Sequence, residues 1–126
     1  MLVLDTSAWV EWVTATPTGN EVGLHLPPRD EWIVPTMVRL ELSKWLLRVA
    51  PEEISDWILG VAYTCQIVPL NNDLADRAAE ACVSHKLATA DAVIYATARA
   101  HNADLLTCDG HFEGLPGVIY VPKVAQ

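Results

Sequence analysis

Short apolar runs alternate along this chain with longer segments in which apolar residues recur every three or four positions. The first pattern is typical of buried strands, and the second of helices with one apolar face. The runs predict five strands, at residues 2–4, 31–34, 66–68, 104–107 and 118–121. The segments between them predict six helices, at about residues 7–13, 19–26, 36–49, 52–63, 72–85 and 89–102.

The order of these elements indicates how the sheet is built. Strands separated by helices pair in parallel through right-handed crossovers, so we expect an α/β protein with a central sheet and helices on both faces. In such sheets, ligands bind beyond the carboxyl ends of the strands, near the point where the strand order reverses. Side chains that follow strands are therefore the first candidates for chemistry.

Prolines and threonines mark several of the helix boundaries. Pro17 is expected to end the first helix, and Pro27 and Pro28 the second. Thr36 and Thr89 are each expected to cap the helix that follows.

Two acidic residues follow predicted strands. Asp5 comes directly after residues 2–4, and Asp109 lies two residues beyond 104–107. If the first and fourth strands are neighbours, the two carboxylates meet at one edge of the sheet. Each also has an ordinary structural explanation, since Asp5 could cap a helix and Asp109-Gly110 could form a turn.

Glu41 lies in the middle of the helix predicted at residues 36–49. Successive residues of a helix are rotated by about 100°, which gathers the apolar residues of this segment into a stripe along one side. Glu41 falls roughly 70° from the centre of this stripe, at the edge of the buried face. A carboxylate there is partly desolvated, which is costly unless it is paired or metal-bound. The alternative is a salt bridge to Lys44. The stripe consists of Val38, Leu42, Trp45 and Val49.

Asp91 falls in the first turn of the last predicted helix, where a negative charge interacts favourably with the helix dipole. Its neighbours Ala88, Ala90 and Ala92 are small and allow other backbones to approach closely. We therefore expect Asp91 to project into a crowded place rather than into open solvent.

The composition is that of a folded domain with an acidic surplus. The 126 residues are 52% apolar with a mean hydropathy of +0.23, enough to bury the core of a single domain. Sixteen acidic residues face eight basic ones, and the formal charge of −8 argues against a general nucleic-acid coating protein. The surplus fits either carboxylates gathered around cations or a surface that favours solubility.

Cysteine number and hydropathy bear on the compartment. The three cysteines include no C-x-x-C pair, which argues against a disulfide scaffold or a zinc site and favours a reducing cytoplasm. No apolar run approaches the roughly 20 residues that span a membrane, and the apolar N-terminus is too short for a signal peptide. We expect a soluble, cytoplasmic protein without membrane contact.

Taken together, the four acids predict a metal site. Asp5, Glu41, Asp91 and Asp109 could converge on one cleft, where they would repel one another and take up protons unless cations were present. Hard oxygen ligands suit Mg²⁺ or Mn²⁺.

Four segments carry a resemblance that runs in order over nearly the whole chain. They are residues 2–8 (LVLDTSA), Glu41 on its helix, residues 87–98 (LATADAVIYATA) and residues 105–112 (LLTCDGHF), followed by 115–118 (LPGV). This pattern resembles the PIN-domain ribonucleases, and specifically the VapC-type toxins of prokaryotic toxin–antitoxin pairs.

The resemblance implies a three-layer fold around a five-stranded parallel sheet, with residues 1–126 forming a single PIN domain. It implies a Mg²⁺-dependent endoribonuclease in which metal-activated water cleaves RNA to leave 5′-phosphate and 3′-hydroxyl ends. It also implies a homodimer that a cognate antitoxin binds and neutralises. Carried over by position, the metal-site acids are Asp5, Glu41, Asp91 and Asp109, holding one or two Mg²⁺ ions with Mn²⁺ as a substitute. The hydroxyl supports of that site are Thr6, Ser7 and Thr107.

The chain departs from the family pattern at one position. Many relatives carry a further Asp two residues after the last acid, where this sequence has His111. We treat His111 either as an ordinary loop residue or as a contact for substrate or for water at the metal, and Cys108 as an inert thiol. Two other functions stay open: a catalytically inactive PIN-like binding module, and a haloacid-dehalogenase-type phosphatase, which requires an acid at the position of Ser7.

Substrate and partner contacts are less clear from the sequence. Six basic residues could meet RNA phosphates, but they are scattered, so we expect a modest salt dependence of RNA binding. They are Arg39, Lys44, Arg48, Arg77, Lys86 and Arg99. Most of the five tryptophans are expected in the core, with one or two on a dimer or antitoxin surface.

Overall fold

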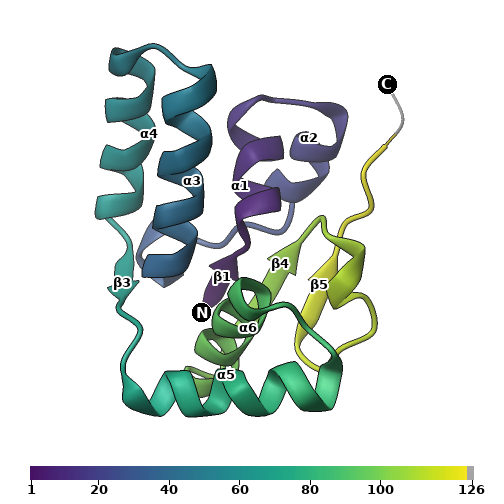
Figure 1. Cartoon of the computed structure of the whole chain (residues 1–126). Helices are drawn as coiled ribbons and strands as arrows, with labels where there is room; N and C mark the ends of the chain where they lie inside the picture. Colours follow the sequence, from purple (N-terminus) through teal and green to yellow (C-terminus); the bar gives the residue numbers. More distant parts are fainter. Residues whose placement is uncertain (125–126) are drawn as a thin grey trace.

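The computed structural model describes residues 1–124 and contains a five-stranded parallel sheet with strand order β3-β2-β1-β4-β5 (Figure 1). The predicted strands are therefore confirmed, with shifts of one residue at three ends. The second strand begins one residue later than predicted because Arg29–Glu31 form a 3-10 turn, η1. The strands are β1 (Leu2–Leu4), β2 (Trp32–Pro35), β3 (Gln66–Val68), β4 (Asp104–Thr107) and β5 (Val118–Tyr120).

Six α-helices connect the strands within residues 1–124. A second 3-10 turn, η2 (Gly110–Phe112), lies between β4 and β5. The helices are α1 (Thr6–Val13), α2 (Pro17–Gly23), α3 (Thr36–Val49), α4 (Glu52–Tyr63), α5 (Asn72–His85) and α6 (Thr89–Ala100). None of these helices is long and apolar enough to cross a membrane.

The order of the strands places the helices on both faces of the sheet. From β1 the chain steps outward to β2 and β3, and it then returns across the sheet to β4 and β5. Right-handed crossovers therefore put α1 to α4 on one face and α5 and α6 on the other. α6 contacts β1, β2 and β4 and lies in front of β1 and β4 in Figure 1. The predicted α/β architecture is confirmed.

Three predicted helix starts were wrong in detail. α2 begins at Pro17 rather than near Gly19, because Thr16 caps it by accepting a hydrogen bond from the Gly19 N–H at 2.9 Å and proline fits the first helical position. Thr36 and Thr89 are the first helical residues rather than caps, and neither α3 nor α6 has a side-chain cap. The Thr36 hydroxyl instead accepts a hydrogen bond from the Leu70 N–H.

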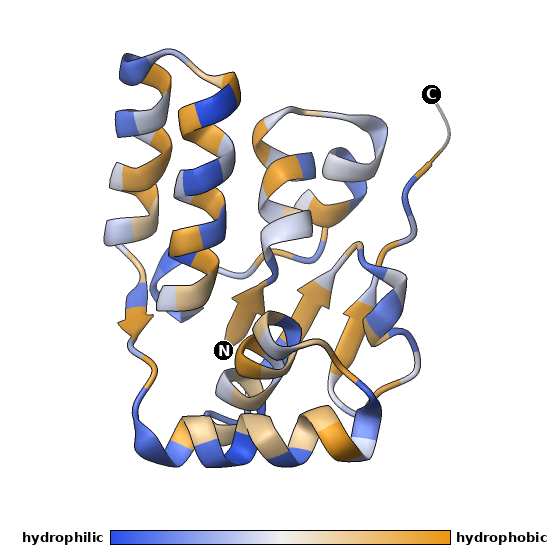
Figure 2. Ribbon diagram, in the orientation of Figure 1, coloured by the Kyte–Doolittle hydropathy of each residue, from blue (hydrophilic) through white to orange (hydrophobic). Residues whose placement is uncertain are grey.

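The apolar core lies along the strands and under α6. β1 and β2 are buried throughout, and every residue of α6 from Ala92 to Ala98 is buried. Figure 2 shows the strands as largely hydrophobic, whereas α5 alternates between hydrophobic and hydrophilic positions. Trp9, Trp12 and Trp32 pack edge-to-face in the core, as predicted for most of the tryptophans.

On α3 the buried face differs from the predicted stripe at its end. Val38 and Leu42 are buried as expected, but Leu46 takes the next place and Val49 is exposed. The stripe therefore follows the 3.6-residue period toward Leu46, and Glu41 stays at its edge.

The centre of the sheet is also its switch point. β1 and β4 are direct neighbours, with Leu4 opposite Leu106, and the Asp5 N–H donates to the Leu106 carbonyl at 2.9 Å. The chain leaves β1 toward one side of the sheet and leaves β4 toward the other. The residues after these two strands therefore line the place where α/β proteins bind ligands.

Candidate metal centre

Asp5 stands at the end of β1 and is almost completely buried, with 4% of its surface exposed. Its Oδ2 accepts hydrogen bonds from the Ser7 hydroxyl at 2.6 Å and the Thr107 hydroxyl at 2.9 Å. Its side chain makes no capping bond to α1, so the capping explanation does not account for it. Its Oδ1 accepts no hydrogen bond from residues 1–124 and is left available to a ligand.

Two hydroxyl groups tie the ends of β1 and β4 together. The Ser7 Oγ accepts a hydrogen bond from the Cys108 N–H at 3.0 Å, and the Thr107 Oγ1 accepts one from the Asp109 N–H at 2.9 Å. The two hydroxyl oxygens lie 3.3 Å apart. Each hydroxyl thus donates a hydrogen bond to Asp5 and accepts one from a backbone N–H of the loop after β4. These bonds hold the Asp5 carboxylate in one orientation.

Glu41 reaches the same region from α3. Its side chain is partly buried, as predicted, and its Oε1 accepts a hydrogen bond from the Thr6 hydroxyl at 2.8 Å. The alternative salt bridge to Lys44 is not formed, because Lys44 is exposed and pairs with no acid among residues 1–124. Thr6 therefore orients Glu41, as Ser7 and Thr107 orient Asp5.

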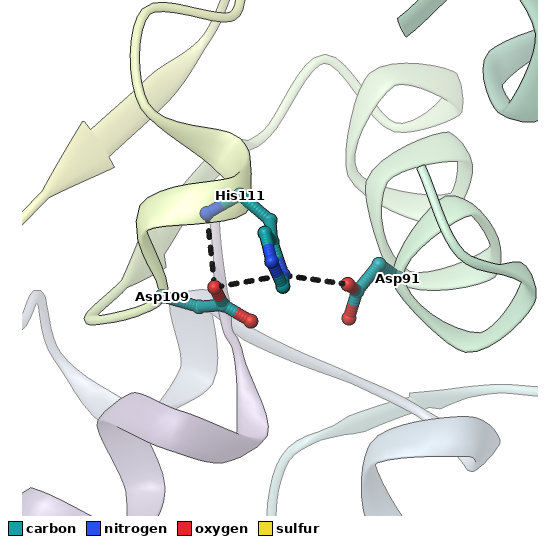
Figure 3. Close-up of side chains that lie close together, drawn as sticks. All are labelled: Asp91, Asp109 and His111. Carbon is teal, nitrogen blue, oxygen red and sulfur yellow. Dashed lines mark hydrogen bonds and ion pairs between the residues drawn. The ribbon is translucent and has the colours of Figure 1, made fainter. Parts of the chain in front are cut away.

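Asp109 and Asp91 meet around a histidine (Figure 3). The Asp109 Oδ1 accepts the His111 N–H at 2.9 Å, so the turn predicted at Asp109 is present. The His111 Nδ1 lies 3.2 Å from the Asp109 Oδ1 and 3.8 Å from the Asp91 Oδ2. Ligand atoms of these three residues all lie within 4.8 Å of one another. Asp5 and Glu41 contribute no atom to this tighter group.

The charges of neighbouring acids act on both Asp5 and Asp91. Burial and, after it, the charges of Asp5, Asp109 and Glu41 together raise the pKa of Asp91 to about 6, against an opposing effect of His111. Burial also raises the pKa of Asp5, and the charges of Glu41 and Asp109 add to this against the two hydroxyl hydrogen bonds. The four carboxylates are therefore close enough to interact, and ionisation of Asp5 and Asp91 is disfavoured unless positive charge is supplied.

These residues fit a divalent cation. The donor set is four carboxylates and one imidazole, and no Lys or Arg within residues 1–124 forms an ion pair with any of the four acids. Carboxylate oxygens are the ligands that Mg²⁺ and Mn²⁺ prefer, and a bound ion would offset both the cost of burying these charges and the repulsion between them. The neighbouring Cys108 thiol is buried, and its pKa of about 11 keeps it protonated.

The role of His111 could not be decided from the sequence. The signal was its position two residues after Asp109, where many relatives of the resembled family carry an acid. The contact with Asp91 could not be read from the sequence, because it requires η2 and the start of α6 to lie side by side.

A parallel sheet with an acidic cluster at its switch point defines a class of α/β proteins with a candidate cation site. The family model described as PIN domain matches residues 2–118, and the chain therefore belongs to the PIN-domain family. Comparison with curated protein sequences finds no significant match.

Solved structures share the fold over nearly their whole length. A chain of a toxin–antitoxin complex from Klebsiella pneumoniae is 21% identical with a TM-score of 0.85, covering 98% of this chain and 100% of that one. VapC20 of Mycobacterium tuberculosis, a toxin that cleaves the sarcin–ricin loop, is 19% identical with a TM-score of 0.76, covering 97% and 100%. VapBC2 of Rickettsia felis, bound to a promoter DNA fragment, is 17% identical with a TM-score of 0.72, covering 94% of this chain and 96% of that one.

Proposed function

We propose that this chain is a metal-dependent endoribonuclease and the toxin of a VapBC-type toxin–antitoxin pair. One observation carries the proposal. Asp5 is buried at the switch point of a PIN-domain sheet, with one carboxylate oxygen held by two hydroxyls and the other unpartnered, among three more acids. Such a carboxylate is costly in a metal-free protein and well placed to bind a cation.

In this proposal the four acids hold one or two Mg²⁺ ions, with Mn²⁺ as a substitute, and the three hydroxyls fix the acids. When bound, the cation supplies Lewis acidity, which activates water for attack on the scissile phosphorus and offsets charge on the phosphoryl oxygens. Ser7 and Thr107 keep Asp5 in one orientation, and Thr6 does the same for Glu41. Such orienting partners are commonly worth about 10–100-fold in metal affinity or activity.

Two of the basic residues offer a place for the RNA backbone. Arg77 and Arg99 line a pocket of about 250 Å³ between α5 and α6, together with Glu80. Arg99 forms no ion pair within residues 1–124. Its guanidinium lies against Gly117, and any larger residue at position 117 would collide with it. Arg99 is eight residues from Asp91 on α6, which is about 12 Å along the helix axis. RNA bound at the acids could therefore place a phosphate near Arg99.

The partner proposals rest on the surface of α3 and α4. Leu47, Ile54 and Trp57 are exposed there, and Trp57 has 66% of its surface accessible. Exposed apolar groups of this size are typical of protein interaction surfaces. We propose that these side chains are covered by a cognate antitoxin or by a second copy of the chain, the two protein partners predicted from the sequence.

The test is an RNA cleavage assay with purified protein. We expect cleavage with Mg²⁺, none with EDTA, and none by Asp5→Asn, with products that carry 5′-phosphate and 3′-hydroxyl ends. Asp104→Asn is the matched control, because Asp104 is an exposed Asp at the opposite end of β4. Cleavage that survives EDTA, or products with cyclic phosphate ends, would refute the mechanism.

The same assay separates the alternatives. An inactive PIN-like binding module would bind RNA or a partner without cutting RNA under any metal condition. A phosphatase of the haloacid-dehalogenase type needs a second acid at position 7, but Ser7 is there and donates its proton to Asp5. The structure therefore gives that reading no additional support.

A further inference from the structure

His111 is held where its ring faces two of the four acids. Its backbone N–H donates to the Asp109 Oδ1, and the next residue, Phe112, is fully buried and anchors the η2 turn. The ring itself is largely exposed, with 79% of the side chain accessible. The backbone position of His111 is therefore fixed, while its ring is free to adjust to a ligand (Figure 3).

The spacing of the three ligand atoms fits a shared ion. Neighbouring ligands on an octahedral ion with bonds near 2.1 Å lie about 3 Å apart. The His111 Nδ1 lies 3.2 Å from the Asp109 Oδ1 and 3.8 Å from the Asp91 Oδ2. Small movements of the exposed ring would bring all three within bonding distance of one cation.

A second, independent feature also indicates a ligand at this place. Asp5 is buried, yet its Oδ1 receives no hydrogen bond from residues 1–124. Its charge also contributes to the raised pKa of Asp91, so the two carboxylates are close enough to interact. Asp5 is a buried carboxylate that leaves one oxygen without a hydrogen-bond donor, next to a group of ligand atoms, so that oxygen is available to a cation.

We propose that His111 is a nitrogen ligand of the cation site, together with Asp91 and Asp109, and that it shifts the metal preference from Mg²⁺ toward Mn²⁺. The proposal rests on the cation site of the proposed function but not on the identity of the RNA. Mg²⁺ prefers an all-oxygen, well-hydrated environment, whereas imidazole favours first-row transition metals. Carboxylates accept Mn²⁺ as well, so a mixed set of two carboxylates and one imidazole suits Mn²⁺.

The competing role for His111 is that of a counter-ion. In that role, a positively charged ring between Asp91 and Asp109 would offset their repulsion in the metal-free chain. The ring would have to move away from the two carboxylates before a cation binds to them. The two roles predict opposite signs. Removal of a ligand weakens Mn²⁺ binding, whereas removal of a counter-ion strengthens the binding of both Mn²⁺ and Mg²⁺.

Direct titration of the full chain with Mn²⁺ and with Mg²⁺, by calorimetry and by the electron paramagnetic resonance of free Mn²⁺, separates these roles. We expect His111→Ala to weaken Mn²⁺ binding about tenfold or more and Mg²⁺ binding less than threefold. His111→Asp should retain Mg²⁺ binding and lose most of the Mn²⁺ preference. His25→Ala, which removes an exposed histidine near α2, should match the wild type. An unchanged ratio of the two affinities in both His111 variants, or tighter Mn²⁺ binding in His111→Ala, overturns the proposal.

A spectroscopic readout keeps the test independent of affinity. Electron spin echo modulation of bound Mn²⁺ should show a directly coordinated nitrogen in the wild type and in His25→Ala, and none in His111→Ala. Binding of both ions without nitrogen modulation contradicts the role of His111 and leaves the proposed function intact. Binding of neither ion by the wild type contradicts both.

Discussion

The candidate centre has two unequal halves, one buried and one open. Around Asp5, every polar neighbour is fixed: the carboxylate is 4% exposed and receives hydrogen bonds from Ser7 and Thr107, whose own oxygens are tied to the backbone. Around Asp109, the η2 turn places an exposed His111 between two carboxylates. The two halves meet because β1 and β4 are neighbours.

The contrast indicates a division of roles. The buried half has the geometry of a fixed anchor, whose position does not depend on the ligand. The open half can change its residues without disturbing the core, since His111 contacts solvent on most of its surface. We therefore expect substitution of Asp5 to abolish function, and substitution of His111 to retune it.

The largest effect is expected from Asp5→Asn. The amide keeps the shape of the side chain but removes the charge, so metal affinity and RNA cleavage should each fall more than about 100-fold, beyond what orienting residues contribute. The melting temperature in EDTA should not fall, because burial already disfavours the charged form of Asp5. Asp104→Asn should match the wild type in both measurements. A melting temperature that collapses in Asp5→Asn would mean that Asp5 is structural.

Thr107→Val should have the next largest effect. The substitution removes one hydroxyl donor to Asp5 and leaves the Asp109 N–H without its acceptor. We expect cleavage to fall about 10–100-fold and the free energy of unfolding, measured in urea, to fall by about 1–3 kcal/mol. Thr6→Val, which affects only the half-buried Glu41, should cost less in both. Equal losses in the two variants would contradict the anchor role of Asp5.

Asp91 allows a test through pH. Its pKa in the folded chain, about 6, lies above the ordinary value of 3.8, so between these values the folded state binds more protons than the unfolded state. The free energy of unfolding without metal should therefore fall as pH rises from about 4 to 7, by on the order of 1 kcal/mol. Asp91→Asn should make this decline smaller, as measured by urea denaturation in EDTA, and the remainder should come from Asp5, whose pKa is also raised. A decline that persists unchanged in Asp91→Asn would contradict the raised pKa of Asp91.

The smallest effect concerns the two arginines on α5 and α6. If each contacts one phosphate, Arg77→Gln and Arg99→Gln should each reduce the slope of log affinity for single-stranded RNA against log salt by about 0.7. Cleavage at saturating RNA should change little. Arg29→Gln, in the η1 turn and not among the candidate phosphate contacts, serves as the control. Slopes equal to that of the wild type would show that the pocket does not hold the substrate.

Much of the fold followed from the sequence because apolar runs and helical periods are local. The strands at residues 2–4, 66–68 and 104–107 have the predicted bounds. The start of α2 was missed because Pro17 was interpreted as a helix breaker, although proline also fits the first turn after a cap. The strand order could not be predicted, since it depends on which crossovers pack against the core.

The candidate site was predicted as a set of residues but not as an arrangement. The position of Asp5 and Asp109 at strand ends is local information, and the structure places both at the switch point. The pairings of Glu41 with Thr6 and of His111 with Asp91 join distant segments. The apolar pattern of a sequence does not predict contacts between distant side chains. A salt bridge between Glu41 and Lys44 was therefore as compatible with the sequence as the contact with Thr6.

A crystal structure of the protein grown with Mn²⁺ tests the central claim most directly, because anomalous scattering locates the ion independently of any assumed role. The account predicts that the strongest anomalous peak lies between Asp5, Asp91 and Asp109, within about 2.3 Å of at least two of their oxygens. It also predicts that the peak is absent from Asp5→Asn crystals grown in the same way. No peak at the ends of β1 and β4, or an equal peak in Asp5→Asn, would contradict the account.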